Sequence, residues 1–424
     1  QEAQLFRNIG KKCRWLANTW PEIGEIGLDE EGLRIVTEIR DERKRKEQED
    51  SKRRWQDLTY MDEAKARKWV MREPLQSAPK QNAKTGPVNP RERAHKFYEE
   101  QRKIWAPTGY KAPTEQDLAE DLAPWLTWVP DGGWEPEKGW GSVKVKGEEL
   151  RKMARRQAGK AAGADGFKAE QLIRLPLGFW DRLARVWNRF LKGERLPRAM
   201  AICRCVGIPK ADGGTRPLSL ASSIWRIANA VFLNTLDDWI HTWAPKELVG
   251  GITRRSAEDT HSLQGDRRCK AEWYGKELSS FKEDQEKCFD TVAPYICVFI
   301  LKKFGLPDEL GKYLMGFYEN QERWVESQGA VHNEPIRCTR SLLQGCANSM
   351  MLLAAPMAVW ARGVVDGGGV MVDVYVDDRI ISSVETDPLP SLKRAAERSD
   401  ELDRVLRLKK HPNKKYAAST SKAL

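Results

Sequence analysis

A pair of adjacent aspartates at the tip of an apolar hairpin constrains this chain more than any other feature of its sequence. Val370–Val376 and Ile380–Val384 are short β-branched runs, which predict two antiparallel strands joined at Asp377-Asp378. A tip selected for stability would carry Asn-Gly or Asp-Gly, which tolerate a positive φ. Two neighbouring carboxylates repel each other, so this tip indicates a cation site, and Mg²⁺ selects carboxylate oxygens. A solvated acidic turn is the alternative interpretation of these residues alone.

A second acidic segment strengthens the prediction of a metal site. Glu277–Asp284 predicts a short strand with Asp284 at its end, just before a helix that includes Phe289. The chain between Asp284 and Asp377 is long enough to return and pair the two strands. Three carboxylates at adjacent strand ends can hold two metal ions about 3.5–4 Å apart, one activating a 3′-hydroxyl and one stabilising a leaving pyrophosphate. The sequence therefore predicts nucleotidyl transfer, with Asp284, Asp377 and Asp378 as catalytic acids and metal ligands.

The charge balance favours an anionic partner. Lys and Arg number 72 against 61 acids, a formal net charge of +11, and nucleic acid is the usual anionic partner of a basic chain. No window approaches the roughly 18 apolar residues of a membrane span, so no membrane association is predicted. Gln1–Gly10 lacks the apolar core of a signal peptide. The eight cysteines form no CxxC pair, so we predict neither a zinc site nor a disulfide framework, and expect a reducing compartment, nuclear or cytoplasmic.

The distribution of periodic segments predicts an α+β fold with an antiparallel sheet. Helical patterns lie at Glu148–Ala158, Phe179–Lys192, Ile224–Trp243, Thr291–Phe304 and Asn348–Ala361. A glycine-rich turn at 212–214 joins Ile202–Pro209 to Arg216–Leu220 in a second predicted hairpin.

The N-terminal third has a different texture. Arg40–Arg54 interleaves acids and bases, which favours a solvated helix with i,i+4 pairs over a dedicated nucleic-acid contact. Residues 71–145 are rich in proline and glycine around Trp125, Trp128, Trp134 and Trp140. We expect either an irregular region packed by aromatic anchors or a linker.

Six segments, in order, resemble the motifs of reverse transcriptases of the non-LTR retrotransposon type. They are Ala162-Gly163-Ala164-Asp165-Gly166; Ile208-Pro209-Lys210 with Gly214-Thr215-Arg216-Pro217-Leu218-Ser219-Leu220; Gly250-Gly251-Ile252 through Asp259; Asp284 through Asp290, a DxxKxFD form; Gln344-Gly345 through Ser349, a QGxxxS form; and Tyr375-Val376-Asp377-Asp378, the YxDD form. The match covers roughly two-thirds of the chain, from about 150 to 415.

The resemblance implies a right-hand polymerase with fingers and palm. It places a charged, Trp-rich, mainly helical or irregular extension at 1–145, the fingers at 146–270 and the palm at 271–424, with the thumb either missing or in a continuation of the chain. The chain starts without methionine, and we expect a fragment or a processed piece.

The resemblance also implies roles for single residues. Asp284 and Asp377 would be metal ligands, with Asp378 as a third acid, and the cofactor would be two Mg²⁺ ions, with Mn²⁺ as a possible substitute. Lys210 and Arg216 would hold the incoming triphosphate; ordinary surface charge is the alternative.

The remaining implied roles concern the nucleotide pocket. Phe289 would be a steric gate that excludes a 2′-hydroxyl, and a core aromatic is the alternative. Gln344 and Gly345 would shape the pocket and the template contact, Gly345 because close backbone approach tolerates no Cβ. Lys414 would lie near the leaving pyrophosphate, or be a solvated charge.

Three positions depart from the family pattern, and a fourth residue has two possible roles. Met350 stands where proline usually follows the motif serine, Ile252 where phenylalanine is usual, and His411 where asparagine is common. Arg379 follows the paired acids and either lowers their effective charge or touches primer phosphate.

These observations favour an RNA-directed DNA polymerase of a non-LTR-type retroelement. It would use an RNA template, a DNA or RNA primer and dNTPs; its protein partners are not predicted. A domesticated or decayed palm that binds RNA as a scaffold is the alternative from another class. An RNA-dependent RNA polymerase is disfavoured by Val376 and Phe289, where such enzymes tend to have Gly and an acid.

Overall fold

The computed structural model describes residues 89–209, 215–327 and 329–420, together with Arg45 and Glu49. Contacts divide the chain into two compact units, Gln1–Gly86 and Pro87–Leu424, and the second unit is described here. The Arg40–Arg54 run lies outside the described residues apart from Arg45 and Glu49, which are helical. Within the described ranges, no helix has the length and apolar character needed to cross a membrane.

The helices and strands alternate irregularly along the chain. The helices are α4 (Pro90–Trp105), α5 (Glu115–Leu122), α6 (Gly147–Arg156), α7 (Ala169–Ile173), α8 (Leu177–Leu191), α9 (Ser223–Thr235), α10 (Asp237–Trp243), α11 (Ala257–Tyr274), α12 (Cys288–Thr291), α13 (Pro294–Lys303), α14 (Asp308–Glu319), α15 (Ala347–Val365) and α16 (Leu389–Val405). The strands are β1 (Ile202–Pro209), β2 (Thr215–Ala221), β3 (Glu277–Gln285), β4 (Glu322–Ser327), β5 (Ala330–Val331), β6 (Ile336–Arg337), β7 (Met371–Tyr375), β8 (Asp378–Glu385) and β9 (Lys410–Ser419).

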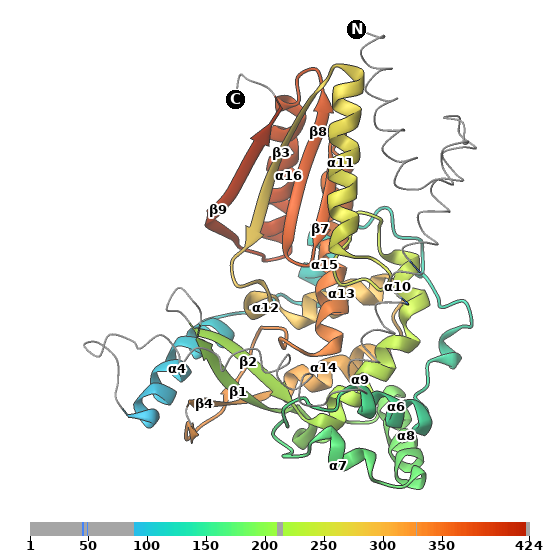
Figure 1. The fold of residues 1–424 in the computed structure, drawn as a ribbon, viewed down its shortest axis with the longest axis vertical. Coiled ribbons are helices and arrows are strands. Elements are labelled where there is room, and N and C mark those ends of the chain that lie inside the picture. The colour runs from blue at the N-terminus through green and yellow to red at the C-terminus, as the bar shows by residue number, and fades with distance from the viewer. Residues whose placement is uncertain (1–44, 46–48, 50–88, 210–214, 328, 421–424) are drawn as a thin grey trace. The chain divides into compact units, whose positions relative to one another are not determined.

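One sheet carries the acidic segments. Its strand order is β7-β8-β3-β9, and every pairing is antiparallel. Helices α11 and α16 cover its two faces (Figure 1). The predicted hairpin and the strand before Asp284 are therefore both confirmed. Strand β8 lies between β7 and β3. The hairpin around Asp377 and the strand that carries Asp284 are therefore neighbours in one sheet.

A second sheet has the order β2-β1-β4-β5, with β6 also paired to β4. The predicted hairpin is confirmed, since β1 and β2 are antiparallel with Pro209 opposite Thr215. Strand β4 joins β1 in parallel. Helix α4 packs on this sheet and encloses a small core with Phe97, Trp105 and Val325.

Helix α15 forms the centre of the main core. Residues from Met351 to Ala361 are buried on every side of it, as expected for a helix that is apolar all round. The described part of the Trp-rich region packs against this core: Trp125 is buried, and Trp134 contacts Phe304 edge-on. For residues 89–145 the aromatic-anchor expectation is thus confirmed, and this stretch belongs to the same compact unit as the rest. The division into fingers and palm at residue 270 stays a prediction.

Two predicted helices are interrupted. Thr291–Phe304 is split between α12 and α13, because Ala293 precedes Pro294 and takes an extended conformation (φ −91°, ψ 121°) that relieves the clash with the ring. Ile224–Trp243 is split at Leu236 into α9 and α10. Helix α15 begins at Ala347, upstream of Met350, so the missing proline leaves the helix start intact.

Candidate active site

Asp284 stands near the end of β3, an interior strand of the acidic sheet. The register between β3 and β9 shifts between Glu283 and Gln285. The resulting irregularity in β9 brings Lys414 to Asp284, and its Nζ atom lies 2.8 Å from Asp284 Oδ2. A cation is therefore already paired with the first predicted metal ligand.

The turn between β7 and β8 is shifted by one residue from its predicted position. Tyr375 pairs with Asp378, so the two turn residues are Val376 and Asp377 rather than Asp377 and Asp378. Val376 has a φ of 63°, a conformation that a β-branched residue rarely adopts and that costs on the order of 1–3 kcal/mol. Surrounding contacts must hold this strained turn in place.

The segment 247–250 supplies those contacts. Val374 donates its N–H to the Glu247 carbonyl at 2.8 Å, and Val249 donates to the Val374 carbonyl at 2.8 Å. Gly250 then passes so close to the turn that a Cβ atom there would lie 2.5 Å from the Val376 nitrogen. Only glycine allows this approach, which makes Gly250 a support for the aspartate turn.

The three acids have different surroundings. Burial raises the pKa of Asp377 above its ordinary value, and the nearby charges of Asp378 and Asp284 raise it further. Asp378 instead forms an ion pair with Lys282 across the strands, Nζ to Oδ1 at 3.0 Å. The pKa of Lys414 is raised, first by its hydrogen bond to Asp284. The three carboxylates therefore repel one another, and Lys282 and Lys414 neutralise part of their negative charge.

A single large cavity joins most of the predicted site residues. Its lining includes Asp284, Asp377, Phe289, Gln344, Gly345, Arg216 and Lys414, which come from both sheets, the β7–β8 turn, α12 and the segment before α15. Asp378 lies outside this lining. Lys210 falls outside the described residues, so its predicted role stays a prediction. The structure thus brings seven of the nine predicted side chains to one cavity wall.

The residues predicted to shape the nucleotide pocket, Phe289, Gln344 and Gly345, all line this cavity. Phe289 packs partly buried against the main core and also lines the cavity, so the gate and core interpretations are compatible. Gln344 donates from Nε2 to Asp290 Oδ2 at 3.3 Å. Gly345 has a φ of 89°, and a Cβ atom there would meet nothing within 4 Å. The positive φ is by itself a reason for glycine at this position, and the predicted close approach of its backbone to nucleotide or template stays a prediction.

A family profile described as reverse transcriptase (RNA-dependent DNA polymerase) matches residues 208–421. This is about half of the chain, and it includes the aspartate turn and the cavity residues on β2, β3 and β9. The chain belongs to the reverse transcriptase family. It is accordingly an RNA-directed DNA polymerase with a palm-and-fingers fold, acting with a nucleic-acid template, a primer and dNTPs. No curated protein matches the sequence.

In this reverse transcriptase, Arg379 does neither of the things predicted for it. Its side chain is fully buried and does not line the cavity. Nη1 lies 2.7 Å from Asp403 Oδ1, and Nη2 lies 3.0 Å from Glu283 Oε2. It therefore reaches neither the acid cluster nor the cavity.

Sequence reasoning missed several residues of the site. Lys282 stands two residues before Asp284, so the strand period alone could have placed both on one face. Arg226 lines the cavity, donates to the Ala161 carbonyl at 2.6 Å and has its pKa lowered by burial. Trp105 donates from Nε1 to Asp290 Oδ1 at 2.9 Å. The last two belong to helices whose placement depends on tertiary packing, so no local signal marked them.

The fit of a divalent metal can be judged from the donors present. In the described part of the chain, no group of three or more His, Cys, Asp or Glu side chains stands in ligand geometry. Asp284 and Asp377 nevertheless line one cavity, and Mg²⁺ is usually bound by one or two carboxylates together with substrate phosphates. Burial and then the charges of Asp378 and Asp284 raise the pKa of Asp377, and a bound cation would oppose both effects by stabilising the carboxylate. The donor chemistry therefore fits a metal that binds together with nucleotide.

Proposed function

We propose that this reverse transcriptase serves a non-LTR-type retroelement and extends a primer 3′-hydroxyl with dNTPs on an RNA template by two-metal nucleotidyl transfer. One observation carries the proposal. The cavity that holds Asp284 and Asp377 is also lined by Phe289, Arg216 and Lys414. Acids, an aromatic ring and phosphate-binding cations are the parts that templated DNA synthesis needs.

The acids would hold the metals. Asp284 and Asp377, with Asp378 beside them, would bind Mg²⁺ or Mn²⁺, which when bound neutralises the triphosphate and lowers the pKa of the primer hydroxyl. Arg216 on β2 would hold the triphosphate, since a guanidinium matches phosphate oxygens in pairs, and we assign the same role to Lys210, which follows β1 in the sequence. Lys414 would meet the pyrophosphate as it leaves, because its ion pair with Asp284 already places it at the cavity.

The sugar preference would come from Phe289. The ring is anchored against the core and borders the cavity, so it cannot move aside without disturbing the packing beneath it. A 2′-hydroxyl placed against such a ring would be excluded by contact, which favours dNTPs over rNTPs.

Assignment to the non-LTR type is supported by two segments that match that branch. One is Ala162 through Gly166, where Asp165 Oδ2 accepts from the Ser223 backbone N–H at 2.7 Å and so joins this loop to α9. The other begins at Gly250, which supports the aspartate turn. We place the protein in the nucleus or cytoplasm on its cysteine usage.

Primer extension on poly(rA)/oligo(dT) with Mg²⁺ tests the function. The full chain should incorporate dTTP, and Asp377→Ala should abolish incorporation while leaving RNA binding nearly unchanged, since phosphate contacts elsewhere supply most of the affinity. A folded, RNA-binding chain that incorporates nothing would point to the scaffold alternative. Equal use of UTP and dTTP would refute the role of Phe289 and favour an RNA polymerase.

A further inference from the structure

The residues next to the predicted metal ligands form a charged cluster on the opposite face of the sheet. Glu283 precedes Asp284 and Arg379 follows Asp378, so strand alternation turns both side chains to the face opposite Asp284 and Asp378, and neither lines the cavity. Glu283 and Arg379 also stand directly opposite each other in the register of β3 with β8. The cluster thus joins the two strands one residue away from Asp284 and from Asp378.

Arg379 is held on every side. Its guanidinium makes a two-point pair with Asp403 of α16, at 2.7 and 2.8 Å, and a third contact to Glu283 at 3.0 Å. It also lies 4.3 Å from the centre of the Trp360 ring. Two-point pairing and stacking on an aromatic ring fix both the position and the orientation of the planar guanidinium, whereas the ammonium group of a lysine would be held less tightly.

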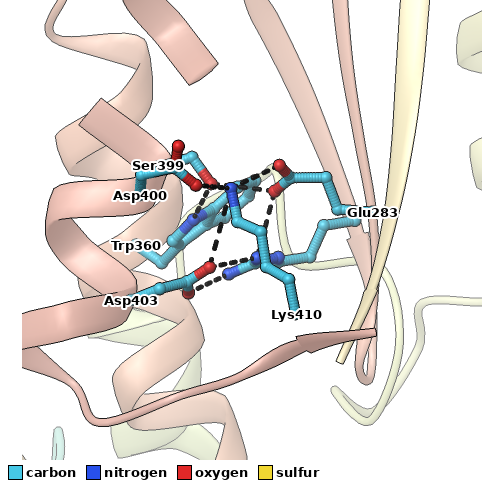
Figure 2. A network of polar contacts seen from close by, with 7 residues as sticks. Glu283, Trp360, Ser399, Asp400, Asp403 and Lys410 are labelled. Atoms are coloured by element: carbon cyan, nitrogen blue, oxygen red, sulfur yellow. Dashed lines mark hydrogen bonds and ion pairs between the residues drawn. The ribbon is translucent and has the colours of Figure 1, made fainter. Parts of the chain in front are cut away.

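Lys410 extends the cluster to β9. It contacts Glu283 and lies 2.6 Å from Asp400 and 3.7 Å from Asp403, while Ser399 donates to Glu283 at 2.8 Å (Figure 2). In the β3–β9 register, Lys410 faces Gln285 while Lys415 faces Glu283. The residues between them, including Lys414, are therefore accommodated in a bulge opposite Asp284, and Lys410 anchors the base of that bulge.

We propose that Glu283, Arg379, Asp403 and Lys410, here called the back-face clamp, position the active site from behind. The clamp fixes β8 on β3, and hence the separation of Asp378 and Asp377 from Asp284. Through Lys410 it also fixes the bulge that brings Lys414 to Asp284. A buried ion pair seldom stabilises a fold more than apolar side chains of equal volume would. We therefore explain this cluster by its effect on the geometry of the active site rather than by a gain in stability. Arg379 is a positioning residue and touches no substrate.

The inference rests on the proposed function, and its test separates the two. The variant Arg379→Met/Asp403→Leu removes one cation and one anion, and leaves Glu283 with Lys410, so no buried charge loses its only partner. We expect it to melt near the wild-type temperature. Its Mn²⁺ affinity without nucleotide, measured by electron paramagnetic resonance, should weaken about ten-fold, the usual scale for groups that orient metal ligands. Its kcat should fall in parallel, with an unchanged Kd for primer–template.

A matched control comes from the other face of the same sheet. Arg267 of α11 pairs with buried Asp373 of β7, Nη2 to Oδ1 at 2.7 Å. Arg267→Met/Asp373→Leu also removes a buried pair from this sheet but leaves the clamp intact, so Mn²⁺ affinity and kcat should stay at wild-type values. An equal loss in this control would overturn the proposal, and so would wild-type values in the folded clamp variant.

The remaining outcomes are also decisive. If the wild-type chain synthesises no DNA, the proposed function fails, and the Mn²⁺ comparison still decides the clamp. If the wild-type chain binds Mn²⁺ only together with a dNTP, the same comparison is made with the dNTP present; if it binds no Mn²⁺ under either condition, both fail. If the clamp double variant does not fold, Lys410→Gln at the partly exposed strand edge replaces it. That change should lower kcat about ten-fold at constant primer–template Kd, and an unchanged kcat would overturn the proposal.

Discussion

Lys414 Nζ lies 2.8 Å from Asp284 Oδ2. The first predicted metal ligand is therefore paired with a lysine that is distant from it in the sequence. Lys414 comes from an edge strand and Asp284 from an interior one. The pair places a positive charge at the cavity that also contains Asp377. This arrangement suits a lysine that meets negative charge as it develops on a leaving group.

Loss of that lysine should slow synthesis. Lys414→Met should lower the single-turnover rate of dNTP incorporation at least about 100-fold, the scale of a positioned proton donor. Because Asp284 raises the pKa of Lys414, the lysine stays protonated through the ordinary assay range, and its titration should not limit activity on the alkaline side. Lys415→Met is the matched control and should retain most activity. Equal losses in the two variants would assign Lys414 to the solvated charges.

We expect the ionised Asp377 side chain to lower the stability of the fold, although DNA synthesis requires it. Its pKa is raised in the folded protein, so its ionisation opposes folding at pH values above the ordinary Asp pKa, and this cost disappears below about pH 4. In EDTA at pH 7, Asp377→Asn should therefore melt slightly higher than wild type, by on the order of 1 °C, while synthesising no DNA. Thermal melts from pH 7 to pH 4 should show the difference shrinking. A lower melting temperature at pH 7 would contradict the electrostatic argument.

Gly250 should be intolerant of any side chain. A Cβ atom there would lie 2.5 Å from the Val376 nitrogen, so Gly250→Ala must displace the aspartate turn. We expect the incorporation rate to fall at least about ten-fold, since misplacing reacting groups by an ångström can cost 100-fold. Gly316→Ala, in α14 with nothing within 4 Å of the new Cβ, is the control and should keep full activity. Unchanged activity in Gly250→Ala would remove Gly250 from the site.

Trp105 should affect nucleotide affinity from outside the family match. Asp290 accepts from the Trp105 indole and from the Gln344 amide, so Trp105→Phe should loosen Gln344. We expect KM for dNTP to rise about five-fold, the factor for about 1 kcal/mol. Trp180→Phe is the control, because the buried Trp180 Nε1 finds no partner among the described residues. If both variants raise KM alike, the effect comes from packing rather than from the hydrogen bond.

The sequence by itself determined the local pieces of this site. Short β-branched runs marked the two strands of the Asp377 hairpin, and paired acids without a stabilising turn sequence marked a cation site. The order of the motifs then indicated the reverse transcriptase family, which the profile match confirmed. Each strand run, turn and motif is made of residues within a short stretch of the chain. These features can therefore be read from the sequence without knowledge of the tertiary structure.

Only the tertiary structure decided which groups meet. Strand pairing moved the turn to Val376 and Asp377, the bulge in β9 placed Lys414 on Asp284, and α16 supplied the Asp403 that holds Arg379 behind the sheet. Lys414 and Asp284, like Asp403 and Arg379, are far apart in the sequence. Their encounters depend on the register between strands and on helix packing, because these set the distances between residues that are far apart in the chain.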